Sequence, residues 1–84
     1  MQFIVTNDHR LRTVGLAEAG FHELSIRFVP SREDAARDLL MRLAGIQVAD
    51  DVAIEAGEEI VDGGRTFRTR HDVDGTLEIV DATH

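Results

Sequence analysis

Alternating apolar and polar residues predict three strands in the first third of the chain. Residues 3–5 are apolar on both faces, which is typical of a buried strand, here over residues 1–6. Asn7-Asp8 supplies turn chemistry, so residues 10–16 are expected to return as a second strand. Residues 22–28 alternate with a period of two, and this pattern predicts a third strand with one face inward. The inward face would carry His22, Leu24, Ile26 and Phe28.

A helical pattern follows. Pro30 favours an extended residue before it, and Ser31 is a favourable N-cap for a helix that starts there. Opposite charges four residues apart predict two ion pairs, Glu33 with Arg37 and Asp38 with Arg42. Gly45 is expected to end the helix, although Ile46 and Val48 would extend the apolar face if the helix continued. The apolar stripe at helical spacing consists of Ala35, Ala36, Leu39, Leu40 and Leu43.

The second half of the chain reads as a meander. Residues 52–56 are expected to be extended, and strands are predicted at 59–61, 65–71 and 76–81. Asp62-Gly63-Gly64 and Asp74-Gly75 are the predicted hairpin turns. We therefore expect a single α+β domain over residues 1–84, with element order β-β-β-α-β-β-β. Its largely antiparallel sheet would have five or six strands and carry one amphipathic helix on one face.

The distribution of charge says more about function than the overall composition does. The formal net charge is −7, and no Lys or Arg occurs between Leu43 and Gly64. A net negative charge repels phosphates, so direct nucleic-acid binding is not expected, whereas a partner with a basic surface is. Met41 falls on the charged side of the helix, where it either touches a neighbouring loop or contacts a partner. The acidic residues of the segment are Asp50, Asp51, Glu55, Glu58, Glu59 and Asp62.

Catalytic and metal-binding signatures do not emerge from the residue types. Without cysteine there is no disulfide or thiolate metal site, which suits a cytoplasmic protein, and no apolar run is long enough for a membrane. His22-Glu23 lacks the second histidine of a zinc motif because Ile26 stands there, and His22 is expected to be buried. Asp72-Val73-Asp74-Gly75 is interpreted as a hairpin turn and not a calcium loop. We expect no catalytic residue, metal or cofactor.

All nine cations are arginines, and three of them lie close together near the end of the chain. Arg68 and Arg70 are two residues apart and would share a face of their strand, and Arg65 precedes them. They are expected to pair across strands with Glu58, Glu59, Glu78 or Asp81. An anion-binding face is the alternative.

A series of short motifs resembles an uncharacterised bacterial domain family. The motifs are Thr13-Val14-Gly15-Leu16, His22-Glu23-Leu24, a helix with Ala35-Ala36 and Leu39-Leu40, and Ala56-Gly57-Glu58. Members of that family carry an aromatic-x-T-V-G-L segment, a P-E-L strand start, an L-L-N-x-L-A helix and a downstream glycine turn. Here Leu11, His22 and Met41 replace the aromatic residue, the proline and the asparagine. The resemblance covers residues 11–70 and implies the order of elements but no activity.

Three functional hypotheses follow. The first is a small acidic interaction module of bacterial or phage origin, such as an inhibitor or regulator that docks on a basic, nucleic-acid-binding surface of a partner protein. It would use the six carboxylates together with Met41. The second is a small-ligand or metal-dependent enzyme that uses His22 or His71 with nearby carboxylates. The third is a self-associating scaffold, for which a homodimer is expected.

Overall fold

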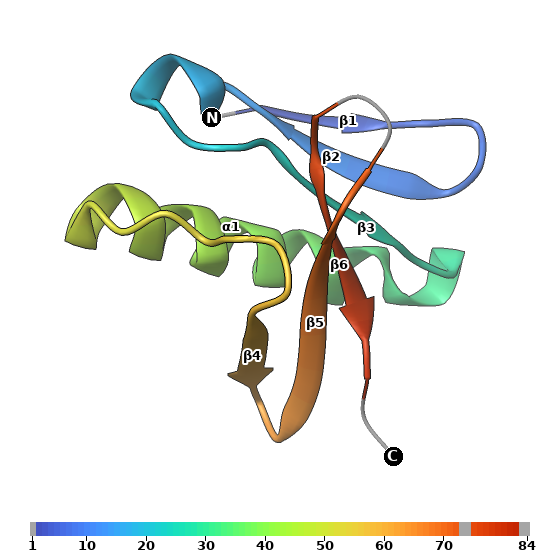
Figure 1. Cartoon of the computed structure of the whole chain (residues 1–84). Coiled ribbons are helices and arrows are strands. Elements are labelled where there is room, and N and C mark those ends of the chain that lie inside the picture. Colours follow the sequence, from blue (N-terminus) through green and yellow to red (C-terminus); the bar gives the residue numbers. More distant parts are fainter. Residues whose placement is uncertain (1, 73–74, 83–84) are drawn as a thin grey trace.

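The fold is a six-stranded sheet with one long helix on one face (Figure 1). The computed structural model describes residues 2–72 and 75–82. The strands are β1 (Gln2–Val5), β2 (Arg10–Val14), β3 (Leu24–Arg27), β4 (Glu59–Asp62), β5 (Arg65–His71) and β6 (Leu77–Asp81), and the helix is α1 (Glu33–Asp50). Two single 3₁₀ turns, η1 (Ala17–Ala19) and η2 (Pro30–Arg32), complete the described elements. The predicted class and element order are confirmed.

The sheet consists of two antiparallel meanders joined by one parallel pair. Its strand order is β1-β2-β3-β6-β5-β4, and only β3 and β6 run parallel. Their pairing is short, from Leu24 opposite Leu77 to Ile26 opposite Ile79. Beyond that point β3 stays beside β2 while β6 turns away with β5 (Figure 1). The carboxyl ends of the two central strands therefore diverge.

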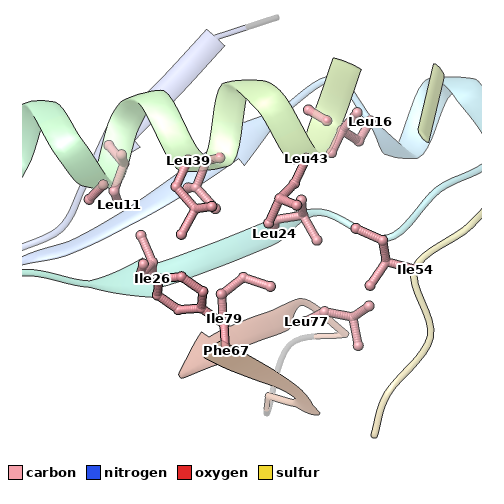
Figure 2. Close-up of a cluster of buried hydrophobic side chains, with 13 residues drawn as sticks. Leu11, Leu16, Leu24, Ile26, Leu39, Leu43, Ile54, Phe67, Leu77 and Ile79 are labelled. Carbon is pink, nitrogen blue, oxygen red and sulfur yellow. The ribbon is translucent and has the colours of Figure 1, made fainter. Parts of the chain in front are cut away.

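The core lies between α1 and the helix-facing side of the sheet (Figure 2). Leu24 and Leu77, from the two central strands, are fully buried, as is Leu40 of the helix. Burial of a leucine side chain contributes about 1.5–3 kcal/mol, so these three side chains fix the helix on the parallel pair. The remaining core residues are Leu11, Leu16, Ile26, Ala36, Leu39, Leu43, Ala44, Ile54, Phe67 and Ile79.

The helix differs from the prediction at both ends. Ser31 lies in η2, and α1 begins at Glu33 without a side-chain cap, so the predicted N-cap is wrong. The helix continues through Gly45 to Asp50, because Ala44 and Gln47 are buried against the sheet and their packing outweighs the intrinsic penalty of about 1 kcal/mol for glycine. Ala35 is exposed and leaves the predicted stripe.

The hairpin at Asp62-Gly63-Gly64 is confirmed, and both glycines have positive φ, as a tight two-residue turn requires. The second predicted turn, Asp72-Val73-Asp74-Gly75, lies partly outside the described residues, which exclude Val73 and Asp74. Residues 52–56 form a loop and not an extended strand. Among the described residues, no helix combines the length and the apolar character that crossing a bilayer requires.

Candidate interaction surface

Four of the predicted acidic residues lie at the end of α1 and in the loop that follows. Asp50 is the last helical residue, and Asp51 closes the helix in a left-handed conformation with φ of 52°, donating its N–H to the Gln47 carbonyl. The Glu58 carboxylate accepts a hydrogen bond of 3.0 Å from the N–H of Glu55. No cation within the described part of the chain pairs with these four carboxylates.

The other two predicted acidic residues are neutralised by arginines. Asp62 accepts hydrogen bonds of 3.2 and 2.6 Å from Arg42, and this pairing raises the pKa of Arg42. Glu59 lies 3.6 Å from Arg68 across the β4–β5 pair. The predicted i,i+4 partner of Arg42, Asp38, is therefore replaced by Asp62. Of the six predicted acidic residues, the ones without an ion pair to another described residue are Asp50, Asp51, Glu55 and Glu58.

This placement of charge opposes the helix that carries it. The carbonyl end of a helix bears a partial negative charge, so a carboxylate there destabilises it by about 0.3–1 kcal/mol. The last turn of α1 contains no basic residue, and Asp50 and Asp51 both lie at that end. Asp51 adds the cost of a left-handed backbone without glycine. Folding alone does not favour these two aspartates.

Exposed apolar side chains lie on the same end of the helix. Met41, Val48 and Val52 are 49, 56 and 59% exposed. The spacing of Met41, Gly45 and Val48 places these three residues on one face of the helix, because residues three or four apart lie on the same side. The row ends at Val48, in the last turn of α1, and Val52 follows after Asp51 has closed the helix. We call Met41, Val48, Val52, Asp50 and Asp51 the acidic–apolar surface.

A shallow groove of about 730 Å³ runs beside this row. Met41, Gly45 and Val48 form its helical wall, and Val14 and Leu16 belong to the facing segment between β2 and η1. An added Cβ at Gly45 would meet no atom within 4 Å, so the groove is open at that point. Met41 lines the groove together with Leu16 of the neighbouring segment, and its role as a loop contact or a partner contact stays a prediction.

The far wall of the groove is held by Glu23, a residue that sequence reasoning did not single out. Its carboxylate accepts hydrogen bonds of 2.8–3.1 Å from the Thr13 hydroxyl and from the N–H groups of Gly15, Leu16 and Ala17. Burial raises its pKa, but these four donors together outweigh burial and lower it below the usual glutamate value. The segment from Gly15 to Ala17 is thereby fixed in place.

The two histidines of the enzyme hypothesis do meet in the structure. The rings of His22 and His71 lie edge to face with centroids 6.0 Å apart, and His22 Nδ1 is 3.2 Å from the Gly75 carbonyl oxygen. Both side chains are exposed, so the expectation that His22 is buried is wrong, because β3 begins only at Leu24. Within residues 2–72 and 75–82, no three His, Asp or Glu side chains gather closely enough to hold a metal ion.

Five arginines line the sheet face opposite the helix. The sequence pattern had placed only Arg68 and Arg70 on one face. The register puts Arg10, Arg12 and Arg27 on the same face as Arg68 and Arg70. The repeated Arg-x-Arg spacing of β2 and β5 was the available signal.

Glu78 is buried at the centre of this arginine-lined face. Its carboxylate accepts from Arg70 Nε and Nη2 at 2.7 and 2.6 Å and lies 3.5 Å from Arg27 and 3.8 Å from Arg10. The predicted cross-strand pairs are confirmed for Arg70 with Glu78, Arg68 with Glu59 and Arg65 with Asp81.

Comparison of the chain with family models, characterised proteins and solved structures gave no match. The resemblance to a bacterial domain family therefore remains a hypothesis. The functional argument rests on the residues of the chain itself.

Proposed function

We propose that the protein is a non-enzymatic interaction module that docks its acidic–apolar surface on a basic surface of a partner protein. The role that fits is an inhibitor or regulator that covers a nucleic-acid-binding site of the partner. The observation that carries the proposal is the pair of aspartates at the carbonyl end of α1, beside an exposed apolar row. Stability alone would place a cation there.

The surface has the parts of a protein interface. Met41, Val48 and Val52 supply an apolar centre, and the groove beside Gly45 can receive a side chain from the partner. Asp50 and Asp51 lie at the edge, where charges steer encounter and select the partner more than they add affinity. A partner with arginine or lysine around an apolar side chain would complement both parts.

Two synthetic peptides of equal positive charge test this, one with leucines between its arginines and one with glycines. We expect both to shift the amide NMR signals of residues 41–52, the leucine peptide to bind more tightly, and salt to weaken both. Asp50→Lys should weaken binding, and Asp8→Lys, an equal charge change on an exposed residue of the β1–β2 turn, should not.

The outcomes separate the alternatives. Equal weakening by Asp50→Lys and Asp8→Lys would show that the effect comes from net charge alone, and absence of shifts at residues 41–52 would refute the docking surface. Sedimentation of the protein alone provides the second readout. A dimer that Met41→Glu converts to a monomer would replace the basic partner by a second copy of the chain and support the scaffold hypothesis.

A further inference from the structure

A second concave site lies at the opposite half of α1. It has a volume of about 580 Å³, within the range of about 300–1,000 Å³ that small-molecule sites occupy. It opens where β3 and β6 diverge after Ile26 and Ile79, and the β4–β5 turn at Gly63 closes another side. Carboxyl ends of parallel strands are a recurrent place for ligands in open sheets, because the divergence leaves a crevice there.

The floor of this cleft is apolar. Ile26, Phe67 and Ile79 lie side by side from three different strands (Figure 2), and Ala36 and Leu39 face them from the helix. All five belong to the buried core. A ligand that reaches the floor therefore needs an apolar body, and a small inorganic anion would gain nothing from it.

The rim has the opposite charge to the protein as a whole. Five arginines and three carboxylates line it, which leaves an excess of two positive charges on a chain of net charge −7. The three carboxylates already have partners, since Asp62 pairs with Arg42, Asp81 with Arg65, and Glu78 with Arg70. The remaining arginines of the rim are Arg27 and Arg32.

These two arginines are available to a ligand. The Arg27 side chain is 65% exposed and lies 3.5 Å from Glu78, which Arg70 already binds through two nitrogens. Arg32 is exposed, and no carboxylate of the described residues lies within ion-pair distance of it. A guanidinium group presents paired donors that match the two oxygens of a carboxylate.

We propose that this cleft binds an organic monoanion, a carboxylate carried on an unbranched apolar chain. Arg27 and Arg32 hold the carboxylate at the rim, and the chain lies on Ile26, Phe67 and Ile79. The two guanidinium groups can both donate to the two oxygens of a single carboxylate, whereas an acidic peptide or nucleic acid would bring its charge along a surface that elsewhere is acidic. The site shares no residue with the acidic–apolar surface, so the two proposals stand or fall separately.

Octanoate is the probe, and amide NMR of the ¹⁵N-labelled protein is the readout. We expect saturable shifts at Ile26, Phe67 and Ile79, and at least tenfold weaker binding of octanol, since one hydrogen bond to a charged group is worth about that factor. Acetate, which has the carboxylate without the chain, should bind more weakly as well.

The variants assign the charge recognition. Arg27→Gln with Arg32→Gln should weaken octanoate at least tenfold. Arg32→Gln alone should weaken octanoate binding by less than the double variant does. This single variant keeps every ion pair of the described residues, so its effect does not come from a disturbed fold. The matched control is Arg68→Gln, because Arg68 is an exposed arginine of β5 that does not line the cleft. Equal affinity for octanoate and octanol, equal effects of Arg32→Gln and Arg68→Gln, or no saturable shift at the cleft would each overturn the proposal.

Discussion

Glu78 offers the most direct test of what holds the two halves of the sheet together. Its side chain is 6% exposed, and the arginines around it come from β2, β3 and β5. The parallel pairing between β3 and β6 covers only three positions on each strand, from Leu24 to Ile26 and from Leu77 to Ile79. Glu78 lies in the middle of that short pairing. The change to study is Glu78→Gln, which keeps the shape and removes the charge.

The magnitude follows from the burial of each partner. Removing one member of a buried ion pair costs about 3–5 kcal/mol when the other charge stays buried. The Arg27 and Arg70 side chains are 65 and 64% exposed and can turn to water, and Arg10 keeps its pair with Asp72. We therefore expect a smaller loss of about 2 kcal/mol, close to one charged hydrogen bond. In a domain of this size such a loss lowers the melting temperature by about 8–16 °C.

Urea unfolding followed by far-ultraviolet circular dichroism is the suitable assay, because the chain has no Trp or Tyr. Glu59→Gln is the control, since Glu59 and Arg68 form an exposed pair at 3.6 Å and should cost no more than about 0.5 kcal/mol. A cycle with Arg70→Gln gives the coupling energy of the pair. If Glu78→Gln costs no more than Glu59→Gln, the central pair does not hold the sheet and the reasoning fails.

Three further outcomes can be checked by the same unfolding assay. The pKa of Glu23 is lowered in the folded state. Its contribution to the free energy of unfolding is therefore complete above the pKa of the unfolded chain and is lost as pH falls through the folded pKa. Glu23→Gln should therefore make the free energy of unfolding less dependent on pH below about pH 5. Gly45→Ala should stabilise the protein by about 0.5–1 kcal/mol, since the added methyl meets open space within a helix. Gln47 is fully buried and accepts the Ile54 N–H at 2.8 Å, so Gln47→Leu should cost about 1–3 kcal/mol by leaving that donor unsatisfied. Each prediction has one contrary result. An unchanged free energy of unfolding for Gln47→Leu, an unchanged pH dependence of stability for Glu23→Gln, or a loss of stability for Gly45→Ala would contradict it.

The elements with local signals could be predicted from the sequence. The glycine turn at Gly63-Gly64 and the apolar stripe around Leu39 and Leu40 depend only on residues that are close in the sequence, and both are present in the structure. The end of the helix could not be predicted in that way. Gly45 reads locally as a stop, but Gln47 beyond it is fully buried and accepts the N–H of Ile54 from the loop that follows the helix.

The candidate surface and the cleft were harder to predict than the fold, because they arise from contacts between residues that are distant in the sequence. Acidic residues of one segment were predicted to form one surface, yet Asp62 and Glu59 are drawn to arginines of other elements. No sequence pattern predicted the hydrogen bonds of Glu23, because its four donors come together only when the chain folds back from β2. The cleft exists only because β3 and β6 are parallel and separate after Ile26, a pairing that no local pattern indicates.

The distribution of charge, and not its total, is what separates the two proposed sites. A net charge of −7 by itself predicts a uniformly acidic surface, but the arginines gather around the first half of α1 and the unpaired aspartates at its end. A helix of this length is about 27 Å long, which exceeds the screening length of about 8 Å at physiological ionic strength. A ligand at either end therefore responds mainly to the charges of that end. Arg32→Gln should leave the basic-peptide affinity unchanged, and Asp50→Lys should leave octanoate binding unchanged, because Arg32 and Asp50 lie at opposite ends of the helix, about three screening lengths apart.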